Sequence, residues 1–323
     1  MAGVIRILFL ILFFLIPEIA KSQQVIYSQY YSSPLNLNPS MTGIGEFGRL
    51  GVNYRNQWTS IGDGYNSYSS WFDYNLLESN FSFGLNFSGE KLNISNYSSN
   101  HISPSISYGL NLNSKMIIQS GFQLTYSSID FDNSQLTFLD QLGPSGLIGI
   151  TAENLNSFNK KSFFNMNYGI LIYNEKFWLG SSIYNLLQPD ISLSSSKNSL
   201  NRNYSIHGGI NIDERISPSF NVIKYPSFIL FNLGSYFIFS PLSIGFWYRG
   251  VPLSNTSNNL DAVVGSINFK NKSIGLSYSY DYNFLDKKLG SHEISIALDF
   301  HFFGKKLHIH SAIFSLFPIK LIL

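Results

Sequence analysis

The chain has 323 residues and a formal net charge of only +2, which gives no reason to expect a polyanionic partner such as nucleic acid. Charged residues make up 12% of the chain and aromatic residues 16%, whereas soluble domains carry about 25% charged residues. The absence of cysteine excludes disulfides, Cys-ligated zinc and a lipoprotein anchor on this chain. The mean hydropathy is +0.04, and no internal run approaches the length of a membrane-spanning helix. Because backbone groups must be paired within lipid, a β-barrel is the main membrane option.

Residues 1–22 are predicted to be a secretory signal peptide that is removed from the mature protein. Arg6 precedes an uninterrupted apolar run from Ile7 to Ile16, and the small residues Ala20 and Ser22 fit a cleavage site before Gln23. A short membrane anchor is the weaker alternative, since a run of this length is too short to span a bilayer.

Residues 23–48 are not barrel-like. Pro34, Pro39 and several asparagines make this a turn-rich segment. We expect it on the periplasmic side or folded into the mouth of a barrel as a small plug.

Residues 49–302 contain recurring segments in which apolar and polar residues alternate, the period of a β-strand with one apolar and one polar face. In the clearest hairpin, the polar face carries Asp281, Glu293 and Asp299, while the apolar face carries no charge. A charge is tolerated in a barrel lumen but is costly on the lipid face. The predicted strands are 49–60, 64–76, 80–90, 100–112, 115–128, 162–173, 177–187, 202–212, 216–225, 227–238, 242–250, 260–269, 272–284 and 291–302.

The predicted fold class is therefore all-β: a transmembrane antiparallel up-and-down β-barrel of about 14 strands in the outer membrane. Counting from a periplasmic start, the short connections fall on one side and the long ones, such as 129–161 and 188–201, on the other, as in outer-membrane barrels. The long 129–161 connection is a candidate functional loop. Residues 303–323 are predicted to form an extra strand, a periplasmic tail or a docking segment.

Catalytic and metal-binding patterns are weak. No Gly-x-Ser-x-Gly elbow and no Gly-rich phosphate loop is present, and His301, His308 and His310 lack companion ligands. Ser205 and His207 share one strand face, so a surface hydrolase is a third and least favoured hypothesis. We expect no enzyme activity, no cofactor and no metal, and we expect lumen carboxylates to pair with Arg55 or Arg249.

Several motifs resemble those of the PorP/SprF family, and they occur in order over nearly the whole mature chain. They are Ser28-Gln29-Tyr30-Tyr31, Asn38-Pro39, Gly43, Asn53-Tyr54-Arg55-Asn56-Gln57-Trp58, Leu136-Thr137-Phe138, Asp140-Gln141, Phe246-Trp247-Tyr248-Arg249-Gly250, Asp261-Ala262, Tyr278-Ser279-Tyr280-Asp281 and Gly290-Ser291-His292-Glu293-Ile294-Ser295. The chain departs from the family in its tail, which has only Lys305-Lys306 where relatives often carry a basic run with a Cys-Pro segment.

The resemblance implies an outer-membrane component of the type IX secretion system that supports secretion or surface attachment of particular cargo, such as gliding adhesins, by non-enzymatic docking. The implied partners are outer-membrane lipid, the C-terminal domains of cargo proteins and the periplasmic ring of the secretion machine. A passive channel for small solutes is the alternative function. The expected partner-binding or family-motif residues are Tyr30, Asn38, Pro39, Arg55, Asn56, Gln57, Trp58, Asp140, Gln141 and Arg249.

Overall fold

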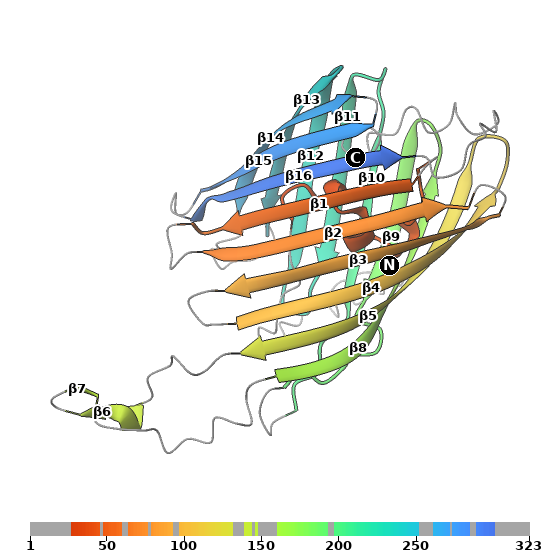
Figure 1. Cartoon of the computed structure of the whole chain (residues 1–323). Helices are drawn as coiled ribbons and strands as arrows, with labels where there is room; N and C mark the ends of the chain where they lie inside the picture. Colours follow the sequence, from red (N-terminus) through yellow and green to blue (C-terminus); the bar gives the residue numbers. More distant parts are fainter. Residues whose placement is uncertain are drawn as a thin grey trace, which may run out of the picture.

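The computed structural model describes residues 27–45, 48–59, 64–76, 79–92, 97–131, 139–143, 146–147, 160–192, 197–251, 261–271, 273–284 and 289–300. Within them, 14 antiparallel strands form a closed barrel in which each strand pairs with its sequence neighbours and the first strand pairs with the last (Figure 1). This confirms the predicted fold class. The strands are β1 (Gly48–Gln57), β2 (Tyr65–Asn75), β3 (Phe81–Leu92), β4 (Tyr97–Asn111), β5 (Ile117–Phe131), β8 (Lys160–Tyr173), β9 (Phe177–Tyr184), β10 (Asn203–Ile210), β11 (Ile216–Lys224), β12 (Ile229–Phe239), β13 (Leu242–Gly250), β14 (Ala262–Asn271), β15 (Ile274–Asn283) and β16 (Ser291–Phe300).

The two faces of the wall differ as the alternation predicts. Along β15, Leu276, Tyr278 and Tyr280 are exposed on the outside, whereas Ser279 and Asp281 are buried in the lumen. An outward row of large apolar side chains gives the barrel a surface that suits lipid, and the inward row of serines, asparagines and charged groups makes the lumen polar.

The connections are sorted by length between the two ends of the barrel. Those after β2, β4, β8, β10, β12 and β14 are short turns, whereas the other end carries the connections 132–159 and 185–202. The small hairpin of β6 (Leu142–Gly143) and β7 (Gly146–Leu147) lies beyond this second end (Figure 1). In outer-membrane barrels the short turns face the periplasm, so the long-connection end faces the cell exterior.

The wall is uneven between β8 and β9. The two strands are paired only from Tyr168 to Tyr173 of β8, because β9 ends at Tyr184 while β8 continues toward the long-connection end. Part of the β9–β10 connection covers the rest of β8 on this side: Leu186 N donates to Met166 O at 2.9 Å.

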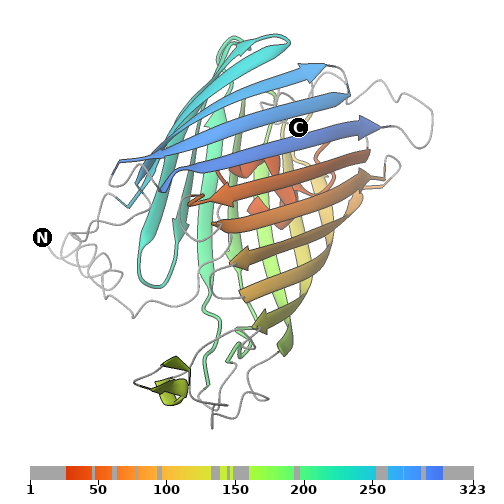
Figure 2. The same ribbon diagram turned by 60° about the vertical axis from the view of Figure 1, so that its left-hand side comes forward.

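The lumen holds the N-terminal segment, residues 27–44, which we call the plug. It consists of three short helices, η1 (Tyr30–Ser32), α2 (Pro34–Leu37) and η2 (Pro39–Met41), each with nearly all its residues buried. Figures 1 and 2 show these helices inside the barrel, behind β1 and β2. No helix among the described residues is long and apolar enough to cross a membrane.

Candidate functional site

The backbone of the plug is irregular, so its carbonyl groups need partners outside regular structure. Lumen-facing side chains of the wall supply them. Gln123 Nε2 donates to Leu35 O at 3.1 Å, and Gln119 Nε2 donates to Thr42 O at 2.7 Å. From β9, Ser182 Oγ donates to Leu37 O at 3.0 Å. The polar lumen face therefore fixes the plug by many separate hydrogen bonds.

Asn38 is the centre of this network and is fully buried. Its Nδ2 donates to Ile170 O at 3.2 Å and Ser181 O at 3.2 Å, and it lies 3.0 Å from His207 Nε2. Its Oδ1 accepts from Ser40 N at 2.9 Å and so starts helix η2. An amide nitrogen only donates, so His207 Nε2 is the acceptor in this contact, and the two Nδ2 hydrogens are shared among the three acceptors.

Replacing Asn38 with alanine is expected to lower the free energy of unfolding by about 1–3 kcal/mol, because it removes buried hydrogen bonds and leaves polar partners unpaired. Denaturant unfolding in lipid vesicles, followed by tryptophan fluorescence, measures the change. Asn198→Ala, at an exposed position of the β9–β10 connection, is the control and should unfold like the wild type. Equal stability of the two variants would contradict the assigned role of Asn38.

Four glycines make room for the plug, and we call them the glycine track: Gly84, Gly121, Gly169 and Gly180. Gly121 of β5 and Gly169 of β8 face each other across the strand pair. A methyl group on Gly121 would overlap the backbone of Pro39 and Ser40, and one on Gly169 would overlap Asn38. A glycine inside a strand often marks such a close backbone approach. The four glycines at lumen-facing positions could therefore have predicted a segment packed against this part of the wall, which the sequence analysis missed.

Aromatic side chains of the wall also pack against the plug. Tyr30 packs edge-on against Trp247 with ring centroids 5.4 Å apart, and Tyr31 does the same against Trp178 at 5.8 Å. Burial raises the pKa of the Tyr30 and Tyr31 hydroxyls well above the usual range, so both remain neutral. Trp71 Nε1 donates to Ser32 O at 3.1 Å. Three of the four tryptophans of the chain thus contact the plug and can report its position.

A cluster of buried charges holds the start of the plug. Asp281 Oδ2 lies 2.8 Å from Arg55 Nη2 and 2.8 Å from Arg249 Nη1. Glu293 accepts from the backbone N–H groups of Ser28, at 2.5 Å, and of Gln29, at 3.2 Å. We call Arg55, Arg249, Asp281 and Glu293 the ion cluster. The predicted pairing of Arg55 and Arg249 with lumen carboxylates is confirmed.

A second buried ion pair holds the end of the plug. Arg49 Nε donates to Asp73 Oδ1 at 2.9 Å, while Arg49 Nη2 also donates to Met41 O at 3.2 Å. Asp73 Oδ2 accepts from Gly43 N at 2.8 Å. Arg49 was absent from the residues expected from sequence. Its register partner on β2 is Asp73, so opposite charges on facing strands were the available signal.

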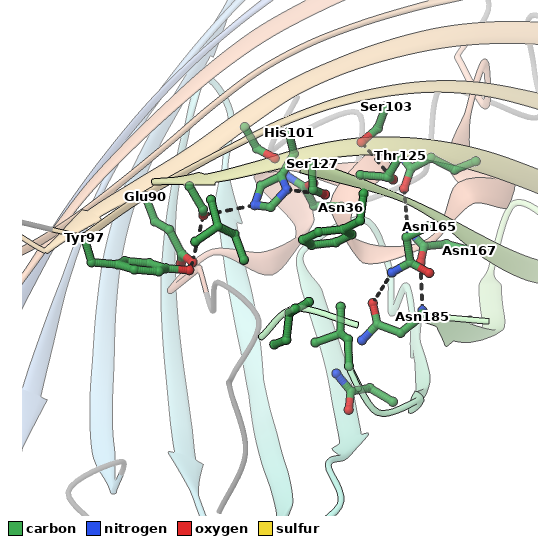
Figure 3. Close-up of a pocket in the computed structure, with 18 of the residues that line it drawn as sticks. Asn36, Glu90, Tyr97, His101, Ser103, Thr125, Ser127, Asn165, Asn167 and Asn185 are labelled. Atoms are coloured by element: carbon green, nitrogen blue, oxygen red, sulfur yellow. Dashed lines mark hydrogen bonds between the residues drawn. The ribbon is translucent and has the colours of Figure 1, made fainter. Parts of the chain in front are cut away.

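A cavity of about 130 Å³ lies between the plug and the long-connection end, and we call it the outer cavity. Tyr27 and Asn36 of the plug form its floor, and the walls come from β3, β4, β5, β8 and the β9–β10 connection. Figure 3 shows Glu90 and Tyr97 at one end and Asn165, Asn167 and Asn185 at the other. The β9–β10 connection is tied to β8 by Lys161 Nζ and Asp190 Oδ2, which are 2.7 Å apart. The Lys161 ammonium lowers the pKa of the Asp190 carboxyl.

The residues expected from sequence separate into two groups. Tyr30, Asn38 and Pro39 belong to the plug, and Arg55 and Arg249 to the ion cluster that holds it. The other five lie elsewhere. Asn56 lies on the outer side of the wall and bonds Asn66, while Gln57 ends β1 and Trp58 lies in the connection that follows. Asp140 and Gln141 belong to the helix η4 (Leu139–Gln141), which precedes β6.

The geometry gives no support for the hydrolase hypothesis at Ser205 and His207. Both side chains are buried, and the hydrogen-bond contact of His207 Nε2 is with Asn38 of the plug rather than with a serine hydroxyl. A general base needs to lie within hydrogen-bond reach of the nucleophile. The candidate histidines His301, His308 and His310 lie outside the described residues, as do the predicted signal peptide and the 303–323 tail.

The closed barrel, its apolar outer face and its plugged polar lumen define an outer-membrane β-barrel protein. Residues 19–298 match the family described as type IX secretion system membrane protein PorP/SprF. The chain belongs to this family, which confirms the resemblance of its motifs and its outer-membrane location. A comparison with curated proteins finds no match.

The solved structures that match this chain are very different from it in sequence. The toluene transporter TbuX of Ralstonia pickettii has a TM-score of 0.51 and 8% identity over 84% of this chain and 94% of its own. A FadL homologue of Pseudomonas aeruginosa has a TM-score of 0.49 and 10% identity, covering 82% of this chain and 93% of its own. Omp33 of Acinetobacter baumannii has a TM-score of 0.44 and 7% identity, covering 79% and 98%. The similarity to TbuX supports the barrel fold alone.

Proposed function

We propose that this protein is a non-enzymatic docking subunit that supports secretion or surface attachment of specific cargo, such as gliding adhesins, by the type IX secretion system. Its family is a membrane component of that system rather than an enzyme family. The proposed partners are the C-terminal domains of cargo proteins, which meet the long-connection end, and the periplasmic ring of the machine, which meets the short turns. Residues 1–22 act as the signal peptide in this proposal.

The observation that supports docking over the channel alternative is the plug. Residues beside a water-filled passage must have exposed side chains, yet Leu35, Asn38 and Met41 are fully buried where the plug crosses the lumen. A barrel of about 14 strands also has a narrower interior than the porins with 16–18 strands that leave an aqueous channel. A plugged barrel offers its partners a rigid surface rather than a path.

Deleting the gene tests this proposal. Loss of a defined set of large surface proteins, or their release into the medium, is expected in the deletion strain, and the wild-type gene should restore them. Mass spectrometry of the cell surface and of the medium measures both. Unchanged cargo in both fractions would reject docking.

The partners can be identified by affinity purification of the protein from native membranes. Co-elution of a surface protein together with components of the secretion machine is the expected result. Recovery of the barrel alone, in a detergent that preserves other such complexes, would argue against the proposed partners and for the channel alternative.

A further inference from the structure

The outer cavity contains a buried carboxyl group, that of Glu90, which has no positively charged partner among the described residues. Among the described residues, the buried carboxylates are those of Asp73, Glu90, Asp281 and Glu293. Asp73 and Asp281 are paired with guanidinium groups, and Glu293 accepts two backbone N–H groups of the plug. Glu90, with an exposed fraction of 7%, has neither kind of partner within the described part of the chain.

Glu90 is held only by neutral hydroxyl groups. Its Oε1 accepts from Ser99 Oγ at 3.0 Å and from Tyr97 Oη at 3.4 Å, and its Oε2 accepts from Tyr65 Oη. Hydroxyl groups orient a carboxylate but do not neutralise it, and an unpaired buried charge is costly. The Tyr27 hydroxyl at the cavity floor is also buried without a hydrogen-bond partner among the described residues. This end of the cavity therefore has unmet capacity for a cationic donor.

The opposite end of the cavity offers no comparable site for a cation. At the opposite end, Asn165 Nδ2 donates to Asn185 Oδ1 at 2.7 Å, and Asn167 Oδ1 accepts from Asn185 N at 3.0 Å, so these amides satisfy one another (Figure 3). The lining also includes apolar side chains that can cover a hydrocarbon chain: Ile129, Phe163, Ile191 and Leu200. The cavity volume, about 130 Å³, is close to the roughly 150 Å³ of a cavity that binds benzene.

We propose that the outer cavity binds a primary ammonium group on a short hydrocarbon stem, namely the side chain of a lysine in a polypeptide that enters from the long-connection end. The ammonium pairs with Glu90 beside Tyr97, and the methylene groups pack against the apolar lining, as lysine stems do on apolar surfaces. A divalent metal ion fits poorly, since Ca²⁺ takes six to eight oxygen ligands, usually with several carboxylates. The polypeptide source rests on the proposed docking function, whereas the chemistry of the cavity does not.

Binding of butylammonium to the purified wild-type barrel, with 1-butanol as the uncharged analogue, tests the cavity directly. Ligand-observed saturation-transfer NMR gives the two affinities. Butylammonium is expected to bind at least about 10-fold more tightly, because a hydrogen bond to a charged group is stronger than one between neutral groups. Equal affinities, or binding of Ca²⁺ in place of butylammonium, would overturn the proposal. This comparison does not require any variant to fold.

Glu90→Gln keeps the shape of the side chain and removes the charge, so it should raise the Kd for butylammonium about 10–100-fold. Glu175→Gln is the matched control, because Glu175 lies in the short turn between β8 and β9, at the other end of the barrel, and should leave the Kd unchanged. An unchanged Kd in a folded Glu90→Gln variant would overturn the proposal.

A final pair of ligands separates the cavity from the docking function. The blocked peptide Gly-Lys-Gly should bind, and the same peptide with norleucine in place of lysine should not. Binding of butylammonium without binding of the lysine peptide would overturn the polypeptide as the source. Normal cargo display in the deletion strain, together with butylammonium binding that depends on Glu90, would reject the docking function and leave the ammonium site standing.

Discussion

Gly121→Ala is expected to displace the plug and open a conducting path through the barrel. The added methyl group would overlap the backbone of Pro39 and Ser40, and a backbone cannot move aside as a flexible side chain can. Overpacking of this kind costs typically about 1–3 kcal/mol. The wild-type barrel should show little conductance in planar bilayers, whereas the variant should show stepwise ohmic openings. Tryptophan emission should shift to longer wavelength, since Trp178 and Trp247 pack against plug tyrosines.

Gly109→Ala is the matched control for this experiment. Gly109 is also a strand glycine, and Ser107 and Ser105, two and four positions before it on β4, are buried in the lumen. A methyl group on Gly109 would lie 3.8 Å from Ile117 Cγ2 and 4.0 Å from the backbone oxygen of Asn80, which are ordinary van der Waals contacts. It should remain closed. Deleting residues 27–44 gives the conductance of the empty barrel for comparison. A silent Gly121→Ala variant with wild-type emission, beside a conducting deletion variant, would show that the plug tolerates the methyl group.

Asp281→Asn is expected to produce the largest loss of stability. The carboxylate pairs with both Arg55 and Arg249, and its removal leaves two buried guanidinium groups without this shared counter-charge. Breaking a buried ion pair by removing one partner costs about 3–5 kcal/mol. Unfolding in lipid vesicles, followed by tryptophan fluorescence, should show this decrease. Release of Tyr27, whose carbonyl accepts from Arg249 Nη2 at 3.3 Å, should accompany it.

Two further variants separate uncompensated charge from loss of packing. Asp281→Leu combined with Arg55→Met, Arg249→Met and Glu293→Gln removes all four charges of the ion cluster, and it should recover most of the stability, because apolar replacement of a buried ion network is often neutral. Asp190→Asn breaks the more exposed pair with Lys161 and should have a far smaller effect than Asp281→Asn. A quadruple variant as unstable as Asp281→Asn would mean that shape, rather than charge, makes Asp281 important.

The positions of the strands could be predicted from sequence because alternation is a local property. All 14 predicted segments overlap the 14 strands of the barrel, where the errors are at the strand ends, whereas the two-residue strands β6 and β7 were not predicted. The segment predicted to run from 177 to 187 ends at Tyr184, since Asn185 has a φ of 61° that an extended strand does not allow. The segment predicted as 49–60 ends at Gln57 for the same reason, because Trp58 has a φ of 59°.

The partners of the lumen residues could not be predicted in the same way. Arg55 and Asp281 are 226 positions apart and meet only because closure of the barrel places β1 beside β16. Asn38 and His207, 169 positions apart, meet because the plug turns back into the lumen. Alternation indicates that a side chain faces inward, but the point at which the plug touches the wall depends on the curvature of the whole barrel.

The sequence alone therefore determined the membrane barrel, the polar lumen and the family, since each depends on composition, on a period of two or on motifs in order. Only the tertiary structure decided that the turn-rich segment fills the lumen, that the glycine track makes room for it, and that Glu90 has no counter-charge among the described residues. These features depend on which inward-facing groups come within hydrogen-bond distance of one another. Those distances follow from the closure and curvature of the whole barrel, which local sequence patterns do not determine.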